Sequence, residues 1–153
     1  MEQRSEPAGQ YPRGHRSVPH TADLRIEAWA ATREECVAEA VRALVDSFAD
    51  IRPARQRHAS GHLVERHLTG ETDADLVAAA VEEVIYGLDA DGEIPVSVSA
   101  RRADDGGIDL SFHVTGLNEV EITGAAPKAA SLSGLQCGRD PSGRWSCAVT
   151  IDV

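Results

Sequence analysis

Polar and apolar residues alternate along residues 24–30, the first strongly patterned stretch of the chain. A period of two is typical of a strand with one face buried and the other in water. We therefore predict a half-buried strand here. The residues of its apolar face are Leu24, Ile26, Ala28 and Ala30.

Two later stretches carry apolar residues at spacings of three and four, which is typical of helices with one buried face. The first follows Thr32, which forms a capping-box pattern with Glu35, and it stops before Pro53 because proline cannot continue a helix. The second has Thr72 and Asp73 as candidate caps and stops at Gly92, which can adopt the positive φ of a tight helix exit. The apolar positions are Val37, Ala40, Val41, Leu44, Val45 and Phe48 in the first helix, and Leu76, Val77, Ala80, Val81, Val84, Ile85 and Leu88 in the second.

The remaining patterned stretches indicate strands. Residues 55–68 have the least distinct pattern, and we expect a strand there with a polar face turned to water. Residues 94–100 and 108–114 flank an Asp-Asp-Gly-Gly sequence that is a strong hairpin signal. Residues 129–137 and 145–153 flank a second turn. Two helices packed on a mostly antiparallel or mixed β-sheet place the chain in the α+β class.

The length of 153 residues fits one compact domain. Residues 1–16, rich in proline, glycine and charge, are expected to form a flexible leader, and residues 17–153 a single domain. No apolar run resembles a signal peptide or a membrane span, so we expect a cytoplasmic protein. Because they are odd in number and form no CxxC pair, the three cysteines (Cys36, Cys137 and Cys147) are expected to be reduced and buried.

Charge restricts the class of partner. Fifteen Lys and Arg against twenty-five Asp and Glu leave a formal net charge of −10. This balance argues against strong nucleic-acid binding by the chain alone, because such binding depends on a cationic face. It suits a basic partner or a cation site.

Polar residues with candidate chemistry lie directly ahead of the first strand, in His20-Thr21-Ala22-Asp23. The end of a strand places side chains at a rim, where a carboxylate can face a ligand without the cost of burying a charge. The alternative is that Thr21 and Asp23 only satisfy a turn. The chain has no GxSxG, HExxH, P-loop or GxGxxG sequence, so no standard catalytic signature competes with this stretch.

Two further candidates are the C-terminal residues and the only lysine, Lys128. Asp152 points away from the apolar face of its predicted strand, and the α-carboxylate of Val153 lies one residue on. Anions so close repel each other unless a cation is shared, and oxygen ligands favour Ca²⁺, Mg²⁺ or Mn²⁺ over Zn²⁺. The alternative for the terminus is that both carboxylates are simply solvated and bind no cation. The alternative for Lys128 is that a single lysine occurs by chance in a chain whose other basic residues are arginines.

Together these features resemble the archease family, whose members act with RtcB-type tRNA-splicing RNA ligases. The similarity covers about residues 17–153 and rests on His20-Thr21-Ala22-Asp23, Lys128-Ala129-Ala130-Ser131 and Ile151-Asp152-Val153. Leu132 stands where many members have an aromatic residue.

The resemblance implies a non-catalytic protein cofactor, which we expect to be a monomer. Such a cofactor helps the ligase transfer GMP to its own histidine and so permits multiple turnovers. The resemblance also implies that Asp23, Asp152 and Val153 bind a divalent metal at one tip, with His20 nearby. It matches Lys128 to the lysine of a short sequence motif of the family. A stand-alone metal-dependent phosphodiester hydrolase, with His20 as its base, and a chaperone or modulator of another RNA-modifying enzyme remain as alternatives.

Overall fold

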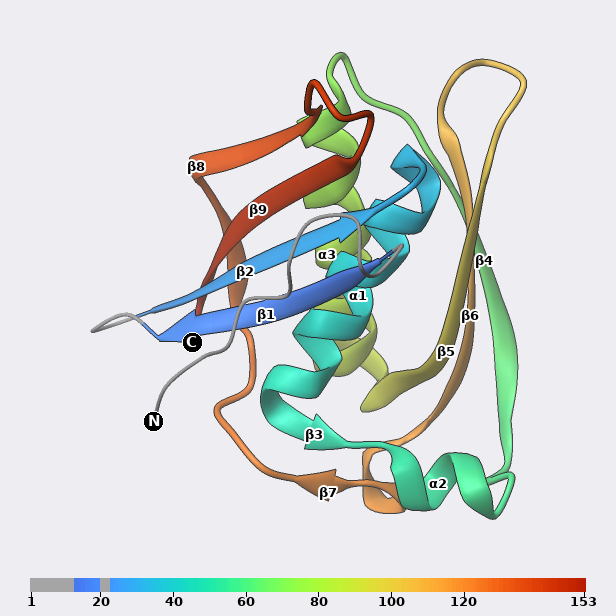
Figure 1. The fold of residues 1–153 in the computed structure, drawn as a ribbon. Helices are drawn as coiled ribbons and strands as arrows, with labels where there is room; N and C mark the ends of the chain where they lie inside the picture. The colour runs from blue at the N-terminus through green and yellow to red at the C-terminus, as the bar shows by residue number, and fades with distance from the viewer. Residues whose placement is uncertain (1–12, 20–22) are drawn as a thin grey trace.

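The computed structural model describes residues 13–19 and 23–153. In this part of the chain, strands and helices are arranged as two larger sheets with two long helices between them (Figure 1). The helices are α1 (Arg33–Phe48), α2 (Arg52–Gln56) and α3 (Asp73–Asp91). The strands are β1 (Gly14–Pro19), β2 (Asp23–Ala30), β3 (Ala49–Asp50), β4 (Gly61–Leu68), β5 (Glu93–Arg102), β6 (Ile108–Gly116), β7 (Glu121–Ile122), β8 (Ala129–Arg139) and β9 (Trp145–Asp152), with a 3-10 turn at Leu117–Glu119.

The first sheet has the order β1-β2-β9-β8 and the second β4-β6-β5, while β3 and β7 form a small pair of their own. The strand pairings are antiparallel throughout the described residues. Helix α1 contacts β2 and β5, and α3 contacts β8 and β5, so each helix is covered by both sheets. The predicted α+β class is confirmed, with the strands divided between two sheets.

The apolar stripes of α1 and α3 supply much of the core. All thirteen apolar positions predicted for the two helices are buried except Leu88, which packs partly buried against the core. Burial of an aliphatic or aromatic side chain stabilises the fold by about 1.5–3 kcal/mol. The largest fully buried side chains are Phe48, Ile26, Leu44, Ile94, Ile108, Leu110 and Ile151.

Both long helices begin at the predicted residues. The Thr32 hydroxyl accepts the Glu35 backbone N–H at 3.1 Å, but the carboxylate of Glu35 receives the guanidinium of Arg13 at 2.8 Å. Helix α3 has a complete capping box, in which Thr72 and Asp75 each bind the other's backbone N–H. Helix α3 ends at Gly92, whose φ of 62° is the left-handed value expected from the sequence.

The prediction over residues 55–68 was wrong in its first part. Residues 52–56 form α2, and the strand begins only at Gly61. Pro53 lies in the first turn of α2, where a helix requires no N–H bond, so it starts a helix here.

The domain also begins earlier than residue 17. Residues 14–16, assigned above to the leader, are part of β1 and pair with β2. Their strand lacks an apolar pattern because polar contacts hold it: His15 lies between Glu39 and Asp46, and Arg16 binds Glu27. Hydrophobic periodicity cannot reveal such a strand.

Candidate functional site

The register of the first sheet brings the two candidate aspartates together. Asp23 is the first residue of β2 and Asp152 the last of β9, and in the antiparallel pairing they stand directly opposite each other. Side chains at directly opposed positions have Cβ atoms about 5 Å apart. Residues separated by most of the chain therefore meet at one end of the sheet, beside the C-terminus in Figure 1.

Lys128, directly before β8, lies at the same end of the sheet. Its backbone N–H donates to the carbonyl of Asp152 at 2.7 Å, and the next residue, Ala129, is the strand partner of Asp152. The Lys128 side chain is exposed. We call the set Asp23, Lys128, Asp152 and Val153 the acidic tip.

The carboxylates of the acidic tip have no hydrogen-bond or ion-pair partner among residues 13–19 and 23–153. Asp23 is half-buried and Asp152 is exposed, so a cation from solution can approach both. Directly opposed like charges destabilise a sheet, and a shared cation removes this cost. Oxygen donors of this kind fit a hard divalent ion.

The structure gives the acidic tip two side-chain carboxylates. Within the described part of the chain no cluster of three or more His, Cys, Asp or Glu side chains is suited to a metal. Val153 follows Asp152, and its side chain packs partly buried against the core. When Val153 is the last residue, its main-chain carboxylate is adjacent in the chain to Asp152. His20, together with Thr21 and Ala22, lies outside the described residues.

One residue that supports the acidic tip was missed by the sequence analysis. The carboxylate of Glu82 on α3 accepts the backbone N–H of Ala130 at 2.9 Å, which fixes the start of β8 beside Asp152. The sequence carries no signal for this bond, because it depends on how α3 packs against β8. Leu132, further along β8, is 78% exposed and adds an apolar side chain to the surface of that strand.

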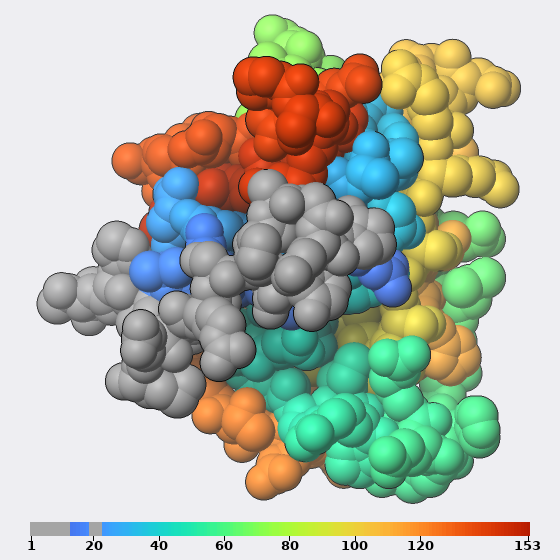
Figure 2. Space-filling view, in the orientation of Figure 1, coloured from blue at the N-terminus to red at the C-terminus, as the bar shows by residue number. Residues whose placement is uncertain are grey.

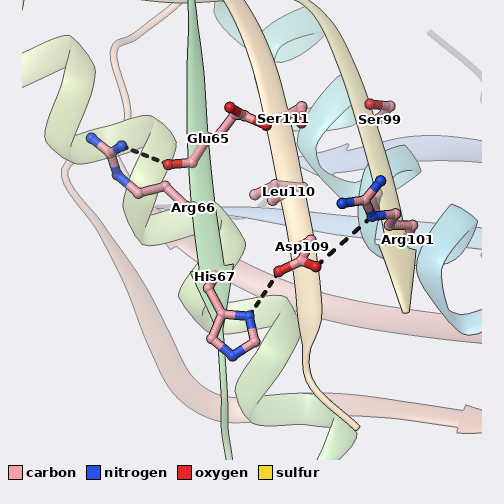
Figure 3. A pocket seen from close by; sticks show the side chains of 9 residues that line it. Glu65, Arg66, His67, Ser99, Arg101, Asp109, Leu110 and Ser111 are labelled. Atoms are coloured by element: carbon pink, nitrogen blue, oxygen red, sulfur yellow. Dashed lines mark hydrogen bonds and ion pairs between the residues drawn. The ribbon is translucent and has the colours of Figure 1, made fainter. Parts of the chain in front are cut away.

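A second polar group lies on the outer face of β4, β6 and β5, far from the acidic tip in sequence (Figure 3). His67 bridges Asp109 at 2.8 Å and Asp105 at 2.7 Å, and Arg101 approaches Asp109 at 3.8 Å. The bond to Asp109, then that to Asp105, raises the pKa of His67. The cluster ties β4 to β6 and to the β5–β6 turn.

The three cysteines lie close together in the fold. Cys36 Sγ lies 3.5 Å from Cys147 Sγ, and Cys137 is the strand partner of Cys147. A hydrogen bond from Cys137 favours the Cys36 thiolate, but the bond to Cys147 and burial outweigh it and raise the pKa of Cys36. The thiols are free, as predicted, with Cys137 only half-buried.

Known proteins share this combination of sequence and fold. Residues 15–153 match the model of the Archease protein family (MTH1598/TM1083). The curated sequences named "Probable protein archease" from Mycobacterium tuberculosis, strains CDC 1551 / Oshkosh and H37Rv, are each 49% identical over 140 residues, which is 92% of this chain and 75% of theirs. The solution structure of Methanobacterium thermoautotrophicum protein 1598 covers 92% of this chain and 99% of its own, with 18% identity and a TM-score of 0.66.

The fold and the paired aspartates thus define an α+β protein with an acidic tip. The chain belongs to the archease family. In the described residues no helix has the length and apolar character needed to cross a membrane.

Proposed function

We propose that this protein is a cofactor that activates an RtcB-type RNA ligase through its acidic tip. The observation that carries the proposal is the direct opposition of Asp23 and Asp152 at the end of β2 and β9. Membership of the archease family supports the same role. The protein itself carries out no bond-making step; it promotes transfer of GMP to the ligase histidine and repeated turnover.

In this proposal Asp23, Asp152 and the terminal carboxylate of Val153 hold a divalent ion, which is Ca²⁺, Mg²⁺ or Mn²⁺. A divalent ion supplies positive charge that neutralises phosphate oxygens of a nucleotide. The tip docks at the ligase's nucleotide site, and Lys128 and His20 contribute to recognition of the ligase. The net charge of −10 speeds the encounter with a basic RNA-binding protein.

Ligase guanylylation tests the proposal. Wild-type protein is expected to stimulate GMP transfer to the ligase at substoichiometric ratios, and Asp152→Asn to lose at least tenfold of this stimulation, as loss of a metal-site residue typically does. Asp91→Asn is the matched control, because Asp91 is an exposed carboxylate at the end of α3. Equal stimulation by Asp152→Asn and wild type would contradict the proposal.

A second experiment distinguishes the cofactor role from that of a stand-alone hydrolase. Purified protein without ligase is incubated with phosphodiester substrates and each divalent metal. The cofactor role predicts no turnover above buffer, whereas turnover that Asp23→Asn abolishes would support the hydrolase.

A further inference from the structure

Helix α2 and the two residues after it form a short basic segment in this acidic protein. Residues 52–58 read Arg-Pro-Ala-Arg-Gln-Arg-His, with three arginines and no acidic residue, in a chain whose net charge is −10. Figure 2 shows this segment, coloured teal, exposed at the lower edge of the molecule. The segment by itself is thus positively charged, in contrast to the chain as a whole.

A hollow of about 590 Å³ lies between α2 and the ends of β5 and β6. None of its nine lining residues is acidic. Arg55 and His58 stand on the α2 side, and Ser97 and His113, which are strand partners, form part of the opposite side. Guanidinium, imidazole and hydroxyl groups are the usual hydrogen-bond donors to phosphate.

Arg55 is available for a ligand. Its neighbours are already paired, Arg52 with Asp50 at 2.8 Å and Arg57 with Glu119 at 2.9 Å. Arg55, by contrast, makes no side-chain hydrogen bond or ion pair with the residues that the structure describes. A free guanidinium in a hollow without carboxylates attracts an anion.

The wall of the hollow is held in place by its own backbone contacts. The Ala59 N–H donates to the Ala54 carbonyl at 2.9 Å, and the Thr115 hydroxyl donates to the Ser60 carbonyl at 2.7 Å. Gly61 lies so close to the Val114 carbonyl that a Cβ there would collide with it. His58 has a φ of 52°, a left-handed value that is uncommon outside glycine. The backbone that carries Arg55 and His58 is therefore held in place, so ligand binding requires no rearrangement of this wall.

A second hollow of about 430 Å³ adjoins the first, because Arg55, Val96 and Ser97 line both. It adds Arg13, Arg42, Arg52 and His15, and its only acidic lining residue, Asp46, binds His15 at 3.0 Å. The two hollows meet at Arg55, and together we call them the α2 trough. Arg13 and Arg42 bind Glu35 and Glu39, and Arg52 binds Asp50, so Arg55 is the arginine of the trough that has no carboxylate partner among the described residues. Its extent suits a ligand with more than one phosphate.

We propose that the α2 trough binds the phosphate groups of a single-stranded RNA segment. The phosphate site stands on the geometry above and does not need the acidic tip. The choice of RNA as the source of phosphate rests on the proposed function, since the substrate of the partner ligase is RNA. Binding by the isolated protein is weak, with a Kd of about 10⁻⁴ M, the range of non-specific contacts.

Residue-resolved NMR of the full chain at low salt tests the site. Inorganic phosphate and a ten-nucleotide single-stranded RNA are titrated separately, and amide shifts are followed. The expected shifts are at Arg55, Ser60, Ser97 and His113. Shifts confined to other surfaces with both ligands, or no shifts with either, would overturn the proposal.

Matched charge variants test the role of Arg55. Arg55→Gln is expected to weaken RNA binding about fivefold and to reduce the slope of log K against log salt by about 0.7, the value for one phosphate contact on a single strand. Arg139→Gln removes the same charge at the exposed end of β8, distant from α2 in Figure 1, and should leave both quantities within experimental error. An equal loss in both variants would mean a general charge effect and would overturn the site.

The outcomes also separate the source of phosphate. Shifts in the trough with inorganic phosphate and no tighter binding of RNA would overturn RNA as the ligand. Because these measurements contain no ligase, they are independent of the guanylylation assay. Loss of ligase stimulation in Asp152→Asn leaves the trough proposal unaffected, and a failure of the trough proposal leaves the proposed role of the acidic tip unaffected.

Discussion

Replacing Asp152 with asparagine distinguishes two contributions to stability at the acidic tip: repulsion between Asp23 and Asp152, and binding of a divalent metal. In wild-type protein Asp152 opposes Asp23 with no compensating partner among the described residues. Neutralising one of two directly opposed like charges is expected to stabilise the metal-free protein by about 0.5 kcal/mol. For a domain of this size that corresponds to a Tm increase of about 1–2 °C.

The same substitution removes the benefit of metal. At a concentration one hundred times its Kd, a divalent ion stabilises a protein that binds it only when folded by about 2.7 kcal/mol, or about 5–10 °C in Tm. Wild type should show this increase on going from chelator to Ca²⁺, and Asp152→Asn should lose most of it. The two variants should therefore exchange their order of stability when metal is added.

Thermal unfolding followed by circular dichroism measures both effects. Melts are recorded in chelator and in Ca²⁺, Mg²⁺ or Mn²⁺ for wild type, Asp152→Asn and the control Asp91→Asn. The reasoning is refuted if Asp152→Asn is less stable than wild type in chelator, or if its increase with metal equals that of wild type.

Three further predictions concern other parts of the fold. Hydrogen bonds to Asp46 and then Glu39 raise the pKa of His15 to about 9, so the stability that His15 contributes is complete below pH 6.5 and is lost as pH rises through 9. In urea unfolding, His15→Gln should lower the free energy of unfolding by about 1–2 kcal/mol at pH 6, after allowance for solvent screening. An equal loss at pH 9.5 would refute this. Arg33, buried between Asp73 at 3.0 Å and the Gly106 carbonyl at 2.9 Å, should on replacement by methionine cost about 3 kcal/mol, and a loss under 1 kcal/mol by the same method would contradict it. The thiols should resist a disulfide reagent at pH 7.5 in native protein. Despite the opposing hydrogen bond from Cys137, the bond to Cys147 and burial raise the pKa of Cys36, and the hydrogen bond to Cys36 together with burial raises the pKa of Cys137. Reaction within minutes, followed by absorbance, would be inconsistent with this environment.

The elements that could be predicted are those whose stability depends on apolar burial. Helices α1 and α3, strand β2 and the β5–β6 hairpin have regular apolar spacing together with caps or turn residues, so local and tertiary preferences agree. Strand β1 and helix α2 carry mainly polar residues, and they are fixed by contacts with distant residues. Such contacts leave no periodic signal in the sequence.

The candidate site was predictable only in part. The sequence places Asp23 directly ahead of one predicted strand and Asp152 at the second-last position of another, but their direct opposition depends on the pairing of β2 with β9. The supporting role of Glu82 depends on how α3 packs. The net charge of −10 likewise gives no indication of the α2 trough, since a sum over the chain does not show where an arginine lies without a carboxylate partner.

The most direct test of the acidic tip is a crystal structure of the protein grown with Mn²⁺, in which anomalous scattering locates the metal. The account predicts one strong peak between the carboxylates of Asp23 and Asp152, and no such peak in crystals of Asp152→Asn. A Mn²⁺ peak bound elsewhere, with none between these two carboxylates, would contradict it.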